Sequence, residues 1–391
     1  MHTPYNTRRM KLDPVRTLLG GATPRQFLTR HWQKQPLLVR GARPGFAGVI
    51  EPPELMRLAC DEQVESRIVV RASGGSPWQV LHGPFRPATF RKLGGRDWTL
   101  LVQDLNHHVQ AAHELLRAFR FLPNARLDDV MVSYAPPGGG VGPHVDSYDV
   151  FLLQGPGRRR WRIGAQRDVT LVDGAPLKLL RRFTPDEDWI LDPGDMLYLP
   201  PSYAHDGTSV TTCMTYSIGF RAPAWQELTE QFLVWLQDRV QREGLYADPG
   251  LAPTRAPGRL GSHLLDRCTA QLARIRWTRG DVSRFLGCYL TEPKPTVFFA
   301  APLSPLSRAG FERRAWRDGV ELDRKSRMLY TGRDVFLNGE LAHLDAPAAR
   351  HLRTLADSGS LRPAPAFRDS LSEPLYGWYR AGFIHLPSQP R

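Results

Sequence analysis

The chain has 391 residues, 41% hydrophobic and 23% charged, which is the composition of a globular protein with room for two or three domains. No apolar run reaches the roughly 18 residues of a membrane span, and residues 1–20 lack the apolar core of a secretion signal, so we expect a cytoplasmic protein. The four cysteines include no C-x-x-C pair and predict reduced, buried thiols rather than disulfides or a structural zinc site: Cys60, Cys213, Cys268 and Cys288.

The net charge is +13, and arginine supplies much of it. Such a surface favours polyanions, including RNA and ribosomal particles. A high-GC genome that places arginine on ordinary solvated surface explains the charge equally well. Charge alone therefore leaves the partner open.

Helical and strand patterns alternate over the first 120 residues. Within the span 13–40, a helix is expected to begin at the plausible N-cap Thr23, and a strand follows at 36–40. Three further strands and a second helix are expected at 67–70, 78–81, 98–102 and 107–120.

Residues 129–220 have a different sequence pattern, because short β-prone runs are separated there by Gly and Pro clusters. The runs lie at 130–134, 150–154, 159–163, 189–191, 196–199 and 214–220. Since no long helical period occurs among them, this segment predicts an antiparallel sandwich or barrel. Gly155-Pro156-Gly157 is typical of a tight hairpin loop.

The next segment is helical. Apolar residues at helical spacing predict an amphipathic helix over 224–242. Its stripe of Trp225, Phe232 and Trp235 is expected to be either core or a dimer interface. Asp281 is a candidate N-cap in the region that follows. Two more helices are expected at 262–277 and 281–290.

A last unit begins near Lys294. Strands are expected at 297–299, 328–331 and 334–337, a helix at 346–357, and a closing segment at 378–385. Mixed elements over a length of about 100 residues predict a small separate α+β domain.

The most informative motif is His144-Val145-Asp146, which is followed further along the chain by His205. Residues i and i+2 of an extended segment point the same way, so this imidazole and carboxylate can share one face. Two imidazoles and one carboxylate on one face of a metal are the usual ligands of non-haem Fe(II) oxygenases. The opposite positions then stay open for a small-molecule cofactor and O₂.

Context separates this motif from a chance H-x-D. A second one, His343-Leu344-Asp345, precedes a predicted helix, and helix capping explains it better than metal binding. Around the first motif, a Pro- and Gly-rich turn at 136–143 leads into His144. Downstream, Asp192-Pro193-Gly194-Asp195 is a turn that leads into the strand expected before His205. This pattern is the cupin arrangement.

Arg159 adds an independent signal. In the run 158–163, the period of two places Arg159 on one face with Trp161 and Ile163, and leaves the other three arginines as an exposed basic ridge. An inward guanidinium needs a buried anion, and a carboxylate offers a bidentate match. A reversed register would instead leave Arg159 in solvent.

Together these residues resemble the JmjC family. The likeness lies in the run 140–155, which contains Gly-Pro-His-Val-Asp, and in the following Gly-Arg-Arg-Arg-Trp block at 157–161. The segments 32–40 and 217–223 are similar to the bacterial ribosomal oxygenases, which hydroxylate an arginine of a large-subunit ribosomal protein. The resemblance covers the whole chain and implies three parts. They are a double-stranded β-helix (cupin/JmjC) catalytic domain at 1–223 with its core at about 129–221, a helical dimerisation module at 224–292 and a winged-helix-like domain at 293–391.

The resemblance also implies roles for single residues. The implied Fe(II) ligands are His144, Asp146 and His205. Arg159 matches the family's partner for the distal carboxylate of 2-oxoglutarate, and Ser133 matches a further contact, although a solvent-facing serine is the competing interpretation. Val141 stands where a threonine is common, so that hydrogen bond is missing. With O₂, 2-oxoglutarate would yield succinate and CO₂ while a substrate C–H is hydroxylated, with no catalytic side chain beyond the metal centre.

The implied ribosomal substrate is basic, like this chain, so long-range charge would oppose docking. The acidic run Asp186-Glu187-Asp188, with Asp192 and Asp195, is either a local counterweight or a solvated loop. A homodimer is expected by family resemblance, and a membrane partner is not. Nucleic-acid contact through the C-terminal domain stays open, because fold alone does not establish it.

Competing functions also remain. A JmjC enzyme that hydroxylates histidine or demethylates lysine would share the metal chemistry and differ only in its pocket. A non-catalytic cupin would bind RNA or ribosomes through the basic surface and would need no intact ligand triad.

Overall fold

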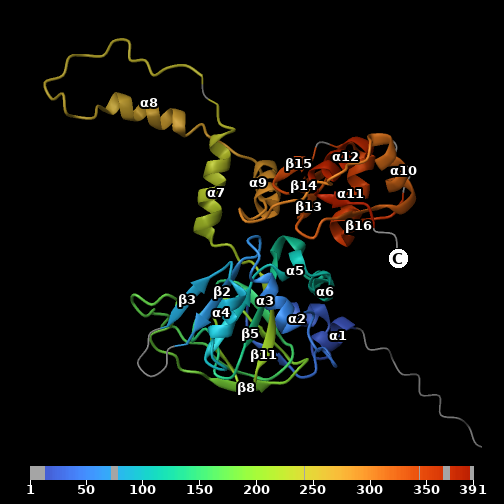
Figure 1. Cartoon of the computed structure of the whole chain (residues 1–391). Coiled ribbons are helices and arrows are strands. Elements are labelled where there is room, and N and C mark those ends of the chain that lie inside the picture. Colours follow the sequence, from blue (N-terminus) through green and yellow to red (C-terminus); the bar gives the residue numbers. More distant parts are fainter. Residues whose placement is uncertain (1–13, 72–77, 242, 343, 364–369, 388–391) are drawn as a thin grey trace, which may run out of the picture. The chain divides into compact units, whose positions relative to one another are not determined.

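The computed structural model describes residues 14–71, 78–241, 243–342, 344–363 and 370–387 (Figure 1). The chain separates into two compact units. The N-terminal unit comprises Met1–Ala222, Lys294–Ala300 and Asp323–Lys325, and the C-terminal unit comprises Pro223–Pro293, Ala301–Leu322 and Ser326–Arg391. Among the described residues, no helix is both long and apolar enough to cross a bilayer.

Two antiparallel sheets form the N-terminal unit. The larger has the strand order β1-β9-β6-β11-β5-β4-β2-β3, and the smaller has the order β10-β7-β8. The strands are β1 Leu37–Val39, β2 Ser66–Val70, β3 Gln79–His82, β4 Trp98–Val102, β5 Leu127–Ala135, β6 Asp149–Gln154, β7 Arg159–Gly164, β8 Glu187–Leu191, β9 Met196–Leu199, β10 Ala204–Ser209 and β11 Cys213–Phe220. The predicted antiparallel β architecture is confirmed.

Short helices accompany the larger sheet: α1 Pro14–Leu18, α2 Pro24–Arg30, α3 Pro52–Leu58, α4 Pro87–Lys92, α5 Leu105–His108, α6 Gln110–Leu115 and the 3₁₀ turns Leu116–Phe119 and Asn124–Arg126. Thr23 caps α2 as predicted, because its side chain accepts the N–H of Gln26 while the Gln26 side chain accepts the N–H of Thr23. The single helix expected at 107–120 is wrong. Val109 adopts an extended conformation there and separates α5 from α6.

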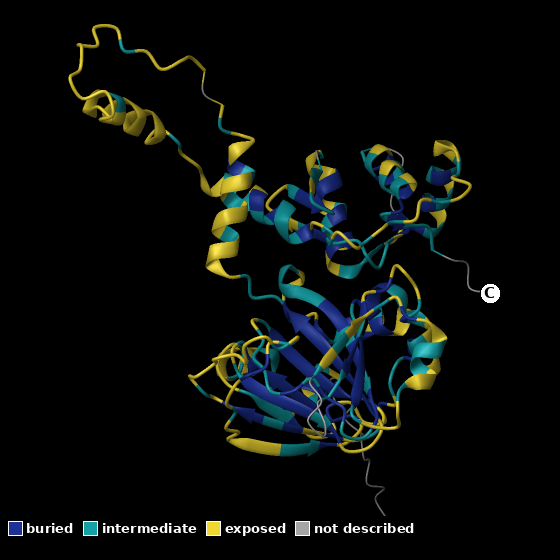
Figure 2. Cartoon of the chain, turned by 60° about the vertical axis from the view of Figure 1, so that its left-hand side comes forward, coloured by how far each residue is buried: buried dark blue, intermediate teal, exposed yellow. Residues whose placement is uncertain are grey.

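The core of this unit is rich in aromatic rings, and its strands are largely buried (Figure 2). Asp149 lies fully buried at the start of β6 and accepts hydrogen bonds from Tyr198 Oη (2.6 Å), Gln33 Nε2 (3.0 Å) and Arg126 Nη2 (3.1 Å). Trp32 stacks on the Tyr198 ring at 6.0 Å. The Trp32-Gln33 pair of the sequence motif therefore fastens the N-terminal segment to the sheet.

The C-terminal unit combines helices with two small sheets. Its helices are α7 Trp225–Gln237, α8 Ser262–Leu272, α9 Arg279–Thr291, α10 Arg308–Asp318, α11 Ala346–Ser358 and α12 Ser372–Ala381. The sheets have the orders β16-β12-β17 and β13-β14-β15, with β12 Val320–Leu322, β13 Met328–Thr331, β14 Asp334–Leu337, β15 Glu340–Ala342, β16 Ser360–Leu361 and β17 Ile384–His385. Gly287 lets α9 approach β14, because a Cβ at that position would lie 2.4 Å from the Phe336 ring.

Several local predictions for this unit need correction. Thr278, not Asp281, is the N-cap of α9, and Asp281 is the third helical residue, whose carboxylate completes the capping box. The strand expected at 297–299 is absent, since that described segment has no ladder partner. Asp345 caps α11 as predicted by accepting the N–H of Ala348, whereas His343 lies outside the described residues.

The four cysteines are all free thiols. Cys213 is buried and Cys60 and Cys288 are half-buried, but the predicted burial is wrong for Cys268, which is exposed on α8. The reason is that α8 as a whole covers no core in the described chain (Figure 2).

Candidate metal centre and cofactor cavity

Backbone pairing brings the H-x-D segment to His205. His144 and His205 form an antiparallel bridge in which each N–H donates to the other residue's carbonyl, at 3.0 and 2.9 Å. The Ser202 N–H donates to the Asp146 carbonyl at 2.8 Å. His205 is the second residue of β10, a strand that pairs with β7 along its length. Two segments far apart in sequence are thus held together by main-chain hydrogen bonds.

The three side chains converge as predicted. Asp146 places Oδ1 3.8 Å from His144 Nε2 and Oδ2 3.5 Å from His205 Nε2. One ligand atom from each residue lies within 4.8 Å of the others, and the described residues contain a single such group of metal-binding side chains. This spacing fits one ion held on one face by two imidazoles and a carboxylate.

Both imidazoles are oriented to bind a metal through Nε2. Each Nδ1 lies 2.9 Å from a backbone carbonyl, that of Gly142 for His144 and that of Tyr203 for His205. A carbonyl only accepts, so each Nδ1 carries the proton and each Nε2 keeps its lone pair for a metal. Burial, reinforced by the neighbouring His144, lowers the pKa of His205 to about 4, so His205 is unprotonated at neutral pH.

A cavity of roughly 440 Å³ opens beside these ligands, and Arg159 lines it. The predicted register is confirmed: Arg159 is 4% exposed and shares the inner face with buried Trp161 and Ile163, whereas Arg158 and Arg160 are exposed. Nε and Nη2 of Arg159 are buried without a hydrogen-bond partner. A buried guanidinium with open donors calls for an anion, and a dicarboxylate that reaches the metal has the matching chemistry.

Ser133 lies in the same cavity. It is buried on β5, opposite Thr215 of β11 and Leu101 of β4, so the solvent-facing interpretation is wrong. Its Oγ has only a long contact, 3.5 Å, to the Thr215 carbonyl and can turn toward a ligand. Val141 also lines the cavity and offers no hydrogen-bonding group there.

The acidic run and the basic ridge engage each other outside the cavity. Arg158 Nε lies 3.0 Å from Asp192, and Arg160 pairs with Asp188 through two guanidinium nitrogens. Asp195 is paired with Arg40 at 2.6 Å. Asp188 and Asp192 are therefore paired with the ridge on the outer face, and none of the five acidic residues lines the cavity.

Sequence reasoning missed an acidic end of the inner β5 face. Alternation places Asp129, Met131 and Ser133 on one side of β5, and the latter two line the cavity. Gly219 lies beside both groups, since a Cβ built there would be in ordinary contact with Asp129 Oδ1 at 3.5 Å and with the Tyr148 ring at 4.0 Å. Burial and the carboxylates of Asp128 and Asp104 raise the pKa of Asp129 to about 7. The same period of two that singled out Arg159 would have found Asp129.

Two further residues line the cavity without a sequence-based prediction. Tyr148 follows Asp146 by two residues and contributes its ring, and Arg67 lies opposite Leu101 in the same cross-strand row as Ser133. Arg67 Nε is buried without a hydrogen-bond partner. The pattern of β2 alone gave no reason to expect a cation facing inward.

Known proteins share this organisation. Residues 114–228 match the family model of the JmjC domain, and residues 274–373 match that of the ROXA-like winged helix. The chain is 36% identical over 355 residues to the ribosomal protein uL16 3-hydroxylase of Escherichia coli, covering 90% of this chain and 92% of that protein. It is 39% identical over 212 residues to a probable ribosomal oxygenase of Haemophilus influenzae, covering 53% and 52% of the two chains.

Solved structures agree. The X-ray structure of E. coli YcfD matches with a TM-score of 0.81 and 34% identity, covering 93% of this chain and 98% of that one. YcfD in complex with cobalt and 2-oxoglutarate, described as a ribosomal oxygenase, matches with a TM-score of 0.80 at the same identity, covering 94% and 99%. A JmjC domain built around a His-Asp-His cluster defines an oxygenase. Within that class, the chain belongs to the ribosomal oxygenase family, whose JmjC domain precedes a ROXA-like winged helix.

Proposed function

We propose that this protein is an Fe(II)- and 2-oxoglutarate-dependent hydroxylase that modifies an arginine side chain of a large-subunit ribosomal protein. One observation carries the proposal: the His-Asp-His cluster and the unpartnered guanidinium of Arg159 face one cavity. The name of the E. coli relative, uL16 3-hydroxylase, and its family's structure with cobalt and 2-oxoglutarate support the substrate class and the cofactors.

The residues have separate tasks in this proposal. His144, Asp146 and His205 hold the iron, Arg159 pairs with the distal carboxylate of 2-oxoglutarate, and Ser133 adds a hydrogen bond to it. When bound, iron and 2-oxoglutarate supply the oxidative chemistry that consumes O₂, releases succinate and CO₂ and hydroxylates a C–H bond. The protein orients the reactants and keeps water out with an apolar lining of Met131, Val150, Leu152, Trp161 and Leu179.

The acidic end of the inner β5 face supports a cationic substrate. Asp129 precedes the cavity-lining Met131 by two residues on that face, and the ring of the cavity-lining Tyr148 lies near it. A guanidinium pairs with a carboxylate and stacks on an aromatic face, and both groups are available here. Local recognition of this kind offsets the long-range repulsion between two basic proteins.

Mass spectrometry of ribosomal proteins from cells with and without the protein tests the substrate. A mass difference of about 16 on an arginine-containing peptide supports hydroxylation, because one oxygen is added. A loss of about 14 would indicate lysine demethylation, and an addition on a histidine would move the substrate to that residue. Purified protein must also form succinate from 2-oxoglutarate in an iron-dependent way, and His144→Ala must abolish it; full turnover by that variant overturns the proposal.

A non-catalytic cupin fits less well. Such a protein has no use for three neutral or anionic ligands held by paired backbone beside a desolvated arginine. Burying an unpaired guanidinium costs several kcal/mol, so a bound anion is the simplest reason for Arg159 to be there. RNA or ribosome binding through the basic surface stays a prediction.

We also propose that the protein is a homodimer formed through the helical module at 224–292. Phe232 and Trp235 of α7 pack on Phe285 of α9 at 5.3 and 6.1 Å, while Trp225 is 85% exposed. Other large apolar side chains of α7 and α8 are also exposed in the described chain: Leu233, Val234, Leu265 and Leu272. A lone eleven-residue helix such as α8 is marginal in water, so a second copy is the simplest cover. Leu265→Asp with Leu272→Asp should give a monomer by light scattering.

The remaining assignments follow from the same proposal. Action on a ribosomal protein places the enzyme in the cytoplasm. We divide the chain into a JmjC domain at 1–223, a helical module for assembly at 224–292 and a winged-helix domain at 293–391, for which nucleic-acid contact is the candidate role. Limited proteolysis near residues 223 and 293 tests the two boundaries of the helical module.

A further inference from the structure

We propose that Lys294 is a positioning residue for the substrate's cationic side chain, acting through Asp104 on Asp129. The inference rests on the proposed arginine hydroxylation. Lys294 follows the helical module in the chain, yet it belongs to the N-terminal unit. Its ammonium group reaches the acidic end of the inner β5 face, where no sequence motif had predicted a cation.

Two successive contacts link Lys294 to Asp129 through Asp104. Lys294 Nζ lies 3.0 and 3.1 Å from the two carboxylate oxygens of Asp104 and 3.5 Å from Asp128 Oδ1. The backbone N–H of Asp104 then donates to Asp129 Oδ2 at 2.9 Å. Asp104 and Asp129 are both buried. Lys294 thus orients the residue that orients Asp129.

The charges explain why a lysine is needed. Three carboxylates meet here, those of Asp104, Asp128 and Asp129, and two cations answer them, Lys294 and Arg221, whose Nε lies 3.0 Å from Asp128. One negative charge is left for Asp129, and an incoming guanidinium would balance it. Without Lys294, three carboxylates, two of them buried, would share one cation, and the proton would go to Asp129. Although burial alone lowers the pKa of Lys294, the three carboxylates together raise it, so the lysine stays charged.

Asp104 is built for this role. It is the N-terminal residue before α5 and adopts a left-handed backbone with φ 49°, which few residues other than Gly, Asn and Asp tolerate. This conformation aims the N–H at Asp129 and the carboxylate at Lys294. Strained residues of this kind persist where the surrounding contacts hold them in place.

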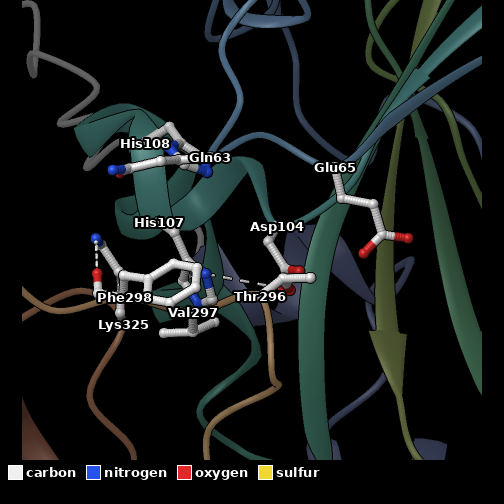
Figure 3. Close-up of a pocket in the computed structure, with 9 residues that line it drawn as sticks. All are labelled: Gln63, Glu65, Asp104, His107, His108, Thr296, Val297, Phe298 and Lys325. Atoms are coloured by element: carbon white, nitrogen blue, oxygen red, sulfur yellow. Dashed lines mark hydrogen bonds and ion pairs between the residues drawn. The ribbon is translucent and has the colours of Figure 1, made fainter. Parts of the chain in front are cut away.

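A second contact holds the same segment and supplies the control. Lys325 Nζ donates to the Phe298 carbonyl at 2.5 Å, at a small pocket lined by Val297, Phe298 and His107 among others (Figure 3). Removing Lys325 loosens the segment 294–300 but leaves the three carboxylates paired. A purely structural role of Lys294 would give both lysine variants the same defect.

The titratable and charged groups around Asp129 come from several elements, and the experiment must account for all of them. They are Asp104 and His107 around α5, Asp128 on β5, Arg67 on β2, Tyr148 before β6, Arg221 after β11 and Lys294. Only Lys294 among them comes from the segment 294–300.

The test measures hydroxylation of an arginine peptide and uncoupled 2-oxoglutarate turnover by the full-length enzyme. Lys294→Met should raise the KM for the peptide about tenfold, as loss of a charged buried contact does. Uncoupled turnover should stay within about twofold, and the acid limb of kcat/KM for the peptide should move up by about one pH unit. Lys294→Arg should restore the KM, and Lys325→Met should change it less than about twofold. Peptide binding to the metal-free protein should show the same order.

A double variant separates electrostatics from tethering. Asp104→Asn in the Lys294→Met background removes the excess negative charge without restoring the tether, so it should recover most of the peptide KM. It also avoids an orphaned carboxylate if Lys294→Met alone fails to fold. Equal KM values for Lys294→Met and Lys325→Met, or no recovery in the double variant, overturn the role of Lys294. Absence of arginine hydroxylation by the parent enzyme would instead overturn the proposed function.

Discussion

The metal-ligand cluster and the acidic end of the inner β5 face are built by different means. At the metal centre, main-chain hydrogen bonds between His144 and His205 fix the ligands, and carbonyls fix their tautomers. At the acidic end, side-chain ion pairs with Lys294 and Arg221 hold the carboxylates in place. Both arrangements join distant parts of the chain, but the first rests on backbone pairing and ligand motifs that the sequence shows. The second rests on charged side chains that no motif marks.

This difference predicts different kinds of failure. A ligand held by backbone pairing can be removed with the strand ladder intact, so its loss should affect chemistry more than folding. A carboxylate held by buried ion pairs shares its charge with its neighbours, so its loss should alter substrate affinity, pH dependence and stability together. The predictions below test that separation.

The largest effect is expected at the metal centre. His205→Ala should lower hydroxylation by at least about a thousandfold, because two remaining ligands hold the metal poorly. Unfolding should remain cooperative, since the β10–β7 pairing is made by the backbone. Iron-dependent succinate formation checks the first outcome and circular dichroism the second. His82→Ala, an exposed histidine of β3, is the control, and equal activity of the two variants would break the assignment.

Arg159→Ala should have the next largest effect. Loss of the buried guanidinium should raise the KM for 2-oxoglutarate about a hundredfold, as removal of one partner of a buried charged pair does. Arg160→Ala is a matched control on the same strand, because Arg160 is exposed and pairs with Asp188. We expect less than a twofold change for the control. Steady-state succinate formation measures both, and similar KM values would place the distal carboxylate elsewhere.

Asp129→Asn should raise the KM for an arginine peptide about tenfold to a hundredfold while leaving uncoupled 2-oxoglutarate turnover nearly unchanged. In the parent enzyme, the pKa of Asp129 near 7 means that the carboxylate is ionised above that pH and protonated below it. The substrate guanidinium stays cationic throughout, so kcat/KM for the peptide should fall as the pH drops below about 7. Asn should remove that acid limb. Asp192→Asn, on the exposed outer face, should keep it.

The sequence alone predicted a site residue where the alternation of side chains along one extended segment determines which face that residue occupies. His144, Asp146 and Arg159 follow from alternation within single strands or loops, and His205 from its Pro-Gly-Asp context. Ser133 needed the structure, because burial of its face depends on β4 and β11, which lie on either side of β5. The role of Lys294 could not be predicted from the sequence for the same reason, because its partners Asp104 and Asp128 come from the start of α5 and from β5.

Errors in the fold had equally local causes. Asp281 and Thr278 both suit a helix start, and only the observed pairing shows that they cap α9 jointly. The apolar run 297–299 has strand propensity but finds no ladder partner, and its central Phe298 is 64% exposed. Helical spacing predicts that the apolar stripe of α7 forms one surface, whereas Phe232 and Trp235 are packed and Trp225 is exposed.

The smallest expected effect concerns stability. An unfolded aspartate has a pKa of 3.8, and burial with neighbouring carboxylates raises that of Asp129 to about 7 in the fold. Between these values the folded state binds the extra proton, so stability falls as the pH rises through this window and the full penalty applies above it. Asp129→Asn has no such penalty, because Asn stays neutral. We expect the variant to be more stable than the parent at pH 8, with the difference vanishing toward pH 4. Urea unfolding at both pH values measures it, and a difference independent of pH would show that Asp129 is ionised without cost.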